Sequence, residues 1–177
     1  VLTNKADGAD SVFAVDMDGD GDIDVLSSSH EDDRIMLFKN DGNENFSAHA
    51  ITTTANHAYS VFALDMDNDG DMDVLSASIY DDKIAWYEND GSENFTSHTI
   101  STTADGAISV SAADVDSDGD MDVLSASSTD NTIAWYENNG SQEFTSHTIS
   151  TAATRVRSVV ATDMDGDGDV DILSAAP

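Results

Sequence analysis

The chain has 177 residues, of which 39% are apolar, and this is enough for one domain of ordinary size. Its formal net charge is −30, from 36 acidic and 6 basic residues, which makes nucleic acids and anionic membranes poor partners for its surface. No apolar run is long enough to cross a membrane, so we expect no membrane insertion. The chain has no cysteine, so disulfides cannot brace the fold.

A nine-residue pattern occurs four times, and each copy starts 49 residues after the previous one. It reads DMDGDGDID at Asp16–Asp24, DMDNDGDMD at Asp65–Asp73, DVDSDGDMD at Asp114–Asp122 and DMDGDGDVD at Asp163–Asp171. Every copy has Asp at positions 1, 3, 5, 7 and 9 and Gly at position 6, so the copies hold 20 of the 36 acidic residues. A fixed period of this size indicates a propeller, a solenoid or an array.

The repeat divides the chain into three complete units and two partial ones. The segments are Val1–Asp10, Ser11–Tyr59, Ser60–Ile108, Ser109–Arg157 and Ser158–Pro177. The first ten residues match the end of a unit, and the last twenty match the start of one. Because the chain opens in mid-pattern, without a Met start or a signal-like segment, we expect a mature form or an excised piece.

Each complete unit contains four predicted strands, named a to d in chain order. In the second unit, strand a is the apolar Ser60–Leu64, and strand b is Asp73–Ser78. Strand c is Lys83–Glu88, and strand d is Phe95–Ile100. The Asn-Asp-Gly at Asn89–Gly91 is a hairpin signal between c and d. Four antiparallel strands in every 49 residues are typical of one propeller blade, so we predict an all-β fold, a β-propeller of four-stranded blades.

The partial units predict an incomplete ring. Residues Val1–Thr3 supply one d strand, which is the outer strand of a preceding blade, and the last unit supplies only strands a and b. The edge of Asp171–Ala175 would therefore stay unpaired, and exposed strand edges invite association. We expect part of a larger or multi-chain propeller, as a piece of a longer chain or as paired copies. A solitary four-bladed ring or an open array is the remaining alternative.

The repeated aspartates indicate a hard divalent cation. Calcium takes about six to eight oxygen ligands, whereas magnesium prefers a small rigid octahedron. Alternation directs the side chains of positions 1, 3 and 5 to one centre, and Gly at position 6 permits the bend that returns position 9. Position 7 usually offers its backbone carbonyl. A single copy could be a solvated turn, but four copies in one register favour calcium.

The loop is not that of an EF-hand, which needs a bidentate Glu at position 12 between two helices. Position 12 is instead serine, and the flanking residues show no helical period, so the loop joins two strands. The serines are Ser27, Ser76, Ser125 and Ser174. The tandem nine-residue repeat of the calcium β-helix is also absent from the sequence.

Other recurring residues have structural interpretations. His49, His98 and His147 recur on strand d, but equivalent positions on separate blades lie far apart, so we expect half-exposed structural roles. Trp86 and Tyr87 alternate along strand c, which favours packing between blades over stacking on a sugar. The serines that open strand a lack a His or acid at a fixed offset. We find no catalytic constellation and expect no enzyme.

The units diverge at two connections, between strands b and c and between strands d and a. The b–c residues are His30-Glu31, Ile79-Tyr80 and Ser128-Thr129, and the d–a residues are Asn56–Tyr59, Asp105–Ile108 and Thr154–Arg157. In an up-and-down blade both connections emerge opposite the aspartate loops. Because loops on a rigid scaffold carry function, we expect a protein or glycan ligand on this face, with loop drift as the alternative.

The aspartate loop, the strand after it and the blade length resemble the FG-GAP/VCBS repeat family, which includes the calcium-binding blades of integrin α-subunit propellers. The resemblance covers essentially the whole chain, and the terminal SAAP of Ser174–Pro177 resembles the GAP element. The FG dipeptide is missing, with Val61 and Phe62 nearby, and the 49-residue unit is shorter than an integrin blade.

The resemblance implies about four calcium ions per chain, one in each loop, bound by the side chains at positions 1, 3, 5 and 9. These are Asp16, Asp18, Asp20 and Asp24; Asp65, Asp67, Asp69 and Asp73; Asp114, Asp116, Asp118 and Asp122; and Asp163, Asp165, Asp167 and Asp171. The carbonyls of position 7 belong to Asp22, Asp71, Asp120 and Asp169.

Two functional hypotheses follow. The first is a calcium-stabilised extracellular or cell-surface binding and adhesion module without catalytic activity of its own. The alternative is a carbohydrate-binding, lectin-like propeller, or the non-catalytic propeller of a polysaccharide-active enzyme. Self-association through unpaired blade edges is expected with either hypothesis.

Overall fold

The computed structural model describes residues 6–177, and these residues form only strands, turns and irregular connections. They include no helix that is long and apolar enough to span a membrane. The predicted d strand at Val1–Thr3 lies outside the described residues.

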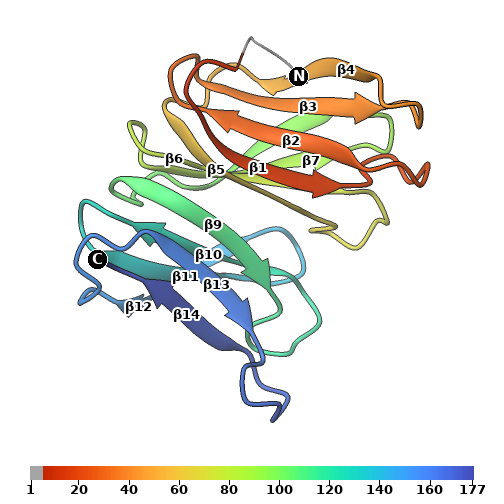
Figure 1. Cartoon of the computed structure of the whole chain (residues 1–177). Coiled ribbons are helices and arrows are strands. Elements are labelled where there is room, and N and C mark those ends of the chain that lie inside the picture. Colours follow the sequence, from red (N-terminus) through yellow and green to blue (C-terminus); the bar gives the residue numbers. More distant parts are fainter. Residues whose placement is uncertain (1–5) are drawn as a thin grey trace.

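The strands form three four-stranded sheets and one two-stranded sheet, each antiparallel and in simple chain order (Figure 1). Blade 1 contains β1 (Ala9–Val15), β2 (Asp24–Ser29), β3 (Arg34–Asn40) and β4 (Phe46–Thr52). Blade 2 contains β5 (Ala58–Leu64), β6 (Asp73–Ser78), β7 (Lys83–Asn89) and β8 (Phe95–Ser101). Blade 3 contains β9 (Ala107–Ala113), β10 (Asp122–Ser127), β11 (Thr132–Asn138) and β12 (Phe144–Ser150). Partial blade 4 contains β13 (Ser158–Thr162) and β14 (Asp171–Ala175). The predicted class, a β-propeller of four-stranded blades with a repeat of about 49 residues, is confirmed.

The observed strands differ from the predicted ones only at their ends. Strand a of blade 2 begins at Ala58 rather than Ser60, and its register against β6 shifts between these two residues. The shift lets the chain turn from the d–a connection into the sheet before regular pairing begins. Strands c and d each extend one residue beyond the prediction, to Asn89 and Ser101.

The hydrophobic core lies between neighbouring blades. The first cluster joins Leu26 and Leu37 of blade 1 to Val61 and Tyr87 of blade 2. The second cluster contains Trp86, which faces blade 3 instead. The alternation of Trp86 and Tyr87 therefore sends one ring to each neighbouring blade, as predicted. Strand b is buried along its whole length in β6 and β10, whereas the d strands are mostly exposed.

Serine hydroxyls at the start of strand a link successive blades. The hydroxyl of Ser60 accepts a hydrogen bond from the backbone N–H of Val110, at 3.3 Å, and Ser109 accepts one from Val159, at 3.2 Å. Two of the serines that recur at the start of strand a, Ser60 and Ser109, are thus bonded to the next blade. This contact places the inner strands β1, β5, β9 and β13 next to one another along the series of blades.

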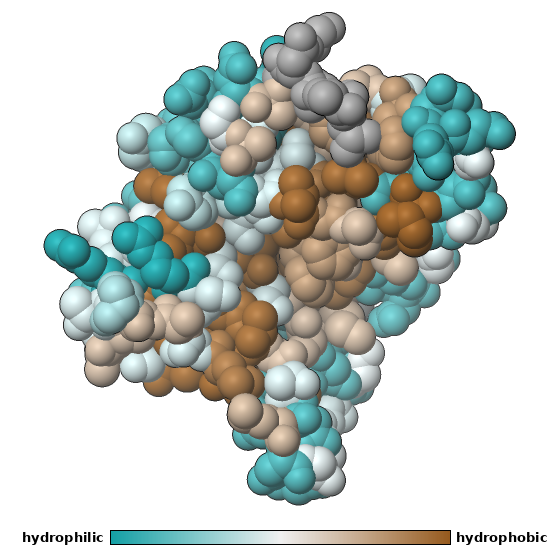
Figure 2. Space-filling model, in the orientation of Figure 1, coloured by the Kyte–Doolittle hydropathy of each residue, from teal (hydrophilic) through white to brown (hydrophobic). Residues whose placement is uncertain are grey.

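The two ends of the series expose surfaces that the interior blades bury. Val12 is 71% exposed, whereas its equivalents Val61, Val110 and Val159 are 4%, 5% and 1% exposed. At the other end, Met164 is 68% exposed, whereas the equivalent Met17 is 3% exposed. Figure 2 shows hydrophobic residues gathered on the side of the molecule where β1, β9 and β13 lie, with hydrophilic residues at the loop tips around them. The four sheets do not close into a ring.

Candidate functional site

The four aspartate loops each connect strand a to strand b of one blade. They are called loop 1 (Asp16–Asp24), loop 2 (Asp65–Asp73), loop 3 (Asp114–Asp122) and loop 4 (Asp163–Asp171). The c–d turns of the blades emerge at the same ends of the sheets. We call the surface formed by these loops and turns the metal face.

Position 1 closes each loop from within. The side chain of Asp16 accepts a hydrogen bond from the backbone N–H of Gly21 at 2.9 Å, and the same bond recurs in the other loops at 3.0, 3.0 and 3.1 Å. Gly21 has a φ of 94°, which glycine adopts readily and other residues do not. A Cβ added there would meet no atom within 4 Å, so backbone conformation, rather than lack of space, favours glycine at position 6.

Position 9 ties each loop to the rest of its blade. One oxygen of Asp24 accepts the N–H of Met17 at 3.0 Å, and the other accepts the N–H of Asn40 at 2.7 Å. The Asn40 side chain returns a bond to the carbonyl of Ile23 at 3.2 Å. Loops 2 and 3 repeat all three bonds. The aspartate pattern alone does not predict this structural role, although the Asn that ends strand c recurs every 49 residues.

Burial changes the proton affinity of these carboxylates. Burial raises the pKa of Asp73 to about 6, although two backbone N–H donors favour the ionised form and lower the pKa. The pKa values of Asp24 and Asp122 are raised for the same reason. Burial also raises the pKa of Asp67, and the neighbouring Asp69 carboxylate adds to this effect. A cation at the loop centre would favour the ionised forms of all these groups.

The loops bring carboxylate oxygens of three residues within 4.8 Å of one another. The groups are Asp16, Asp18 and Asp24; Asp65, Asp67 and Asp69; Asp114, Asp116 and Asp122; and Asp163, Asp165 and Asp171. Positions 1 and 3 belong to every group, position 9 to three of them and position 5 to that of loop 2. In loop 1, Oδ1 of Asp16 is buried and has no hydrogen-bond partner among the described residues. Converging oxygen acceptors, one of them buried without a donor, fit a hard cation.

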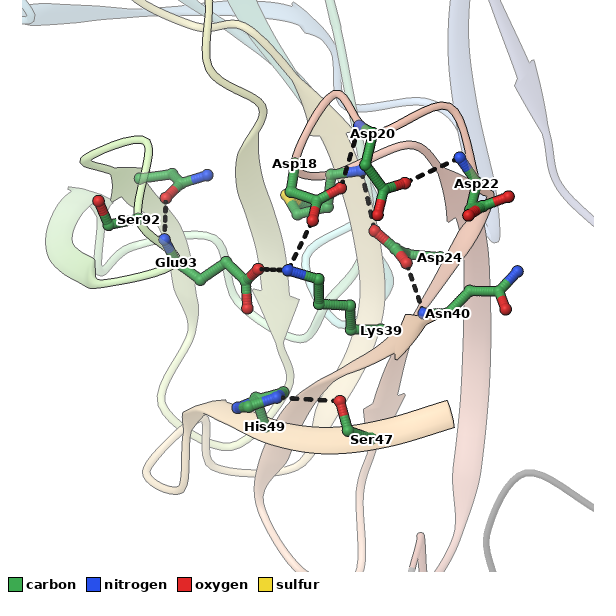
Figure 3. A network of polar contacts seen from close by, with 12 residues as sticks. Asp18, Asp20, Asp22, Asp24, Lys39, Asn40, Ser47, His49, Ser92 and Glu93 are labelled. Atoms are coloured by element: carbon green, nitrogen blue, oxygen red, sulfur yellow. Dashed lines mark hydrogen bonds and ion pairs between the residues drawn. The ribbon is translucent and has the colours of Figure 1, made fainter. Parts of the chain in front are cut away.

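Position 7 directs its side chain to the c–d turn. A Cβ added to Gly42 would lie 2.4 Å from Oδ2 of Asp22, and the pairs Asp71–Gly91 and Asp120–Gly140 repeat this approach at 2.5 and 2.4 Å. Figure 3 shows Asp22 at the side of loop 1, apart from Asp18 and Asp24. The side chain therefore packs against the turn glycine, and the predicted ligand at this position remains its carbonyl.

The residue before the Asn that ends strand c lies beside the loop. In blade 1 it is Lys39, whose Nζ lies 2.5 Å from Oδ2 of Asp18 and 2.5 Å from Oε1 of Glu93 (Figure 3). This ammonium group lowers the pKa of Asp18, and the two carboxylates raise the pKa of Lys39. Blades 2 and 3 have Glu88 and Glu137 at this position. The repeat pattern in the sequence does not by itself indicate that this difference lies beside the loops.

The recurring histidines hold these glutamates in place. Nε2 of His98 lies 2.7 Å from Oε2 of Glu88, and its ring stacks on Trp86 with the centroids 4.5 Å apart. His147, Glu137 and Trp135 repeat the arrangement in blade 3. The predicted structural role of the histidines on strand d is confirmed for these two.

The repeating loops and blades have a counterpart among known families. The FG-GAP-like repeat matches this chain at residues 16–76, 65–125 and 114–174. The chain belongs to the FG-GAP-like repeat family. The resemblance found in the sequence is thereby confirmed, and the three overlapping matches each extend from one aspartate loop to the next strand b.

A lectin has a similar fold to this FG-GAP chain. It is the lectin of Agrocybe aegerita, whose structure was solved to explain specific recognition of non-reducing terminal N-acetylglucosamine. The TM-score is 0.64 at 16% sequence identity, and the match covers 93% of this chain and 46% of the lectin chain. The FG-GAP chain therefore spans about half the length of that structure. No curated protein matches it.

The opposite end of the FG-GAP blades is formed by the b–c and d–a connections, and we call it the loop face. Hydrogen bonds to the backbone join the connections of this face to one another. The carbonyl of His57 accepts the N–H of Ile79 of the same blade at 3.1 Å, while the N–H of His57 is bonded to Asp33 of the preceding blade at 2.8 Å. Gly106 repeats both bonds, with Ser128 and Asp82.

Side chains on this repeated framework differ between the FG-GAP blades. The position of His57 is glycine at Gly8 and Gly106 and arginine at Arg155, and φ is positive at all four residues. The His57 ring stacks on that of Tyr80, with the centroids 4.1 Å apart, and its other neighbour is His30 at 4.5 Å. Tyr80 is 69% exposed. We call His30, His57 and Tyr80 the aromatic row.

Proposed function

We propose that this chain is a calcium-stabilised binding module of the cell exterior or cell surface, with no catalytic activity of its own. One observation carries the proposal: the two ends of the blades differ in what they repeat. The metal face repeats a group of three converging carboxylates in every unit, always with positions 1 and 3 of the loop. The loop face repeats its backbone bonds but changes its side chains. This is the division expected of a metal-braced scaffold that presents a recognition surface.

The metal is calcium, with one ion in each loop. Its ligands are the side chains of positions 1, 3, 5 and 9 and the carbonyl of position 7, as the sequence predicts. Without the ion, the carboxylates of a loop repel one another, so the free energy of calcium binding adds to the free energy of folding. Family membership and the buried, unpartnered Oδ1 of Asp16 support this assignment.

Elemental analysis and melting curves test the calcium sites. We expect about four calcium ions per chain, a markedly lower melting temperature after chelation, and the loss of one ion in Asp67→Ala. A protein that contains no calcium, or a melting temperature that is indifferent to chelator, would contradict the proposal.

The ligand, a protein or a glycan, binds the loop face. His57 supports this placement, because a non-glycine residue at a φ of 61° is strained and two sister positions avoid the strain with glycine. The aromatic row that results, with the exposed Tyr80 ring at its end, gives a preformed stacking surface.

Variants of the row separate binding from stability. We expect His57→Gly and Tyr80→Ala to weaken ligand binding several-fold while stability in urea is unchanged or higher, since glycine relieves strain at position 57. Trp86→Ala is the matched control, because loss of a fully buried ring lowers stability by about 3–5 kcal/mol and leaves the row intact. Binding that maps to the metal face instead would refute the placement.

The aromatic row favours a glycan as the ligand, since sugar rings stack on exposed aromatic side chains. The similar lectin is itself a protein that recognises a terminal sugar. A glycan array with wild-type protein and Tyr80→Ala distinguishes the two hypotheses. Sugar binding that is lost in the variant supports the lectin-like alternative, and a silent array supports a protein ligand.

We also propose that the chain self-associates through the exposed faces at the two ends of the blade series. The residues around Val12 are of the kind that interior blades bury against the preceding blade. The residues around Met164 are of the kind that interior blades bury against the following blade. The two faces are therefore complementary by the repeat itself, in a head-to-tail arrangement.

A further inference from the structure

One position beside the metal face carries opposite charge in different blades. The last residue but one of strand c is Lys39 in β3, Glu88 in β7 and Glu137 in β11. The rest of the surroundings repeats: each of these residues is followed by the Asn that bonds to position 9 of its loop. The difference is therefore a reversal of charge on a conserved framework within one chain.

Lys39 lies between two carboxylates from two blades. Its ammonium group is 2.5 Å from Asp18 at position 3 of loop 1 and 2.5 Å from Glu93 in the c–d turn of blade 2 (Figure 3). Glu93 is held there by its own N–H, which is bonded to Asn89 at 3.0 Å. A positive charge bound in this way already neutralises a carboxylate that the loop would offer to calcium.

Within residues 6–177, which the structure describes, the neighbouring loop has no such cation. The residue equivalent to Glu93 is Gln142 in blade 3, and its amide lies 3.4 Å from Oδ2 of Asp67, at position 3 of loop 2. The c–d turns of blades 2 and 3 thus lie beside the loop of the preceding blade, with a carboxylate near loop 1 and a neutral amide at loop 2. The strand-c residue beside loop 2 is Glu88, which His98 holds at 2.7 Å. Loop 2 therefore has an additional anion where loop 1 has an ammonium group.

We propose that Lys39 makes loop 1 the weaker calcium site, because its ammonium group competes with the ion for Asp18. The same group acts as a tethered substitute cation that holds loop 1 together when calcium is absent. Loops 2 and 3, with Glu88 and Glu137 in place of lysine, fill at lower calcium concentration. This inference rests on the proposed calcium binding and adds an order of filling to it.

The order of filling is measured from the amide resonances of the position-6 glycines Gly21, Gly70 and Gly119 during a calcium titration of the whole chain by nuclear magnetic resonance. In the wild type, the midpoint for Gly21 is expected at about tenfold higher calcium than that for Gly70, since a unit charge a few ångströms from the ion changes its dissociation constant by at least about this factor. Lys39→Glu should lower the Gly21 midpoint about tenfold or more, and Lys39→Gln should give an intermediate value. Added salt should reduce the difference.

Matched controls separate the effect of where the charge lies from the effect of the chain's net charge. Lys83→Glu makes the same change of charge at the other end of β7 and should leave the Gly21 midpoint within about twofold, because exposed charges beyond a Debye length are screened. Glu88→Lys makes the reverse change beside loop 2 and should raise the Gly70 midpoint alone. Glu31→Lys on the loop face is its control.

Melting curves provide a second readout. In chelator, Lys39→Glu should melt below the wild type, because loop 1 has lost its substitute cation; in saturating calcium this deficit should disappear. A deficit of the same size in both conditions would show a merely structural role for Lys39 and would overturn the proposal.

The outcomes separate this inference from the proposed function. Equal midpoints for the three glycines in the wild type, or a Gly21 midpoint that Lys39→Glu does not move, would overturn the order of filling and leave calcium binding intact. A chain in which no glycine responds to calcium would contradict the proposed function and this inference with it.

Discussion

At the scale of single residues, the aspartates of one loop have different structural duties. Asp73 is fully buried and accepts hydrogen bonds from Met66 and Asn89 at 3.1 and 2.7 Å, so it is part of the framework whether or not metal is bound. Asp69 is exposed, and its side chain accepts a hydrogen bond from the backbone N–H of Asp71, within the same loop. The pattern D-x-D-x-D-G-x-x-D does not distinguish these duties, because all positions carry the same side chain.

The two residues should therefore respond differently to removal. We expect Asp73→Ala to destabilise the protein by about 2–4 kcal/mol even in chelator, because two backbone N–H groups lose a buried acceptor. Asp69→Ala should weaken calcium binding at loop 2 while the stability in chelator changes by less than about 0.5 kcal/mol. Urea unfolding with and without calcium measures both, and equal losses in chelator would contradict the division.

His30 gives the loop face a pH dependence. Its ring is hydrogen-bonded to Asp10, with Glu31 also near, and these carboxylates raise the pKa of His30 above its usual range. A raised pKa means that the pair stabilises the fold fully below the ordinary histidine pKa of about 6.5, and that this contribution is lost as the pH rises through the folded-state pKa. We expect a ring titration by nuclear magnetic resonance to place the His30 midpoint above the ordinary histidine value of about 6.5, and Asp10→Asn to lower it. An unchanged midpoint in the variant would refute the pairing.

At the scale of elements, the c–d hairpin and the aspartate loop are fitted to each other. The turn glycine of blade 2, Gly91, has a φ of 74° and leaves room for Asp71. The hairpin signal in the sequence explains the turn, but the contact with the loop becomes visible only in the folded blade.

This fit predicts an unequal cost for two glycine substitutions. Gly91→Ala should destabilise the protein by about 2 kcal/mol or more, since it combines left-handed strain with a clash against Asp71. Gly19→Ala, at a φ of 71° but in open space, should cost at most about 1 kcal/mol. The sister residues Asn68 and Ser117 already tolerate that conformation. Urea unfolding compares the two, and Asp71→Ser should recover only the part of the Gly91→Ala loss that comes from the clash.

At the scale of the whole molecule, the series of blades leaves an exposed face at each end, around Val12 and around Met164, and we propose that these faces are complementary. The exposed β14 edge and the apolar surface around Val12 are the features that a neighbouring blade would cover.

We accordingly predict concentration-dependent association, measured by light scattering on the chain as it is. Val12→Asp and Met164→Asp, at opposite ends, should each weaken association by at least about tenfold, because each places a charge in an apolar contact. Tyr80→Asp is the control, since it changes an equally exposed side chain away from both faces. A strict monomer with a cooperative melt would contradict the prediction.

The sequence by itself determined the blade, because its causes are local and repeat. The apolar strand a, the alternation along strand c, the hairpin turn after it and the aspartate loop are each patterns of a few consecutive residues. A fixed period of 49 residues places them in the same order in every complete unit. The same locality allowed positions 1 and 3 of the loops, as at Asp65 and Asp67, to be assigned to a common centre.

Only the tertiary structure decided the contacts that join separate segments. Lys39, Asp18 and Glu93 come from a strand, a loop and the turn of the next blade, and no spacing in the sequence relates them. The aromatic row likewise draws on three connections. Side chains come into contact according to their distance in space and not their separation along the chain. Such groups therefore depend on how one blade packs against the next, and the surfaces buried between blades set that packing.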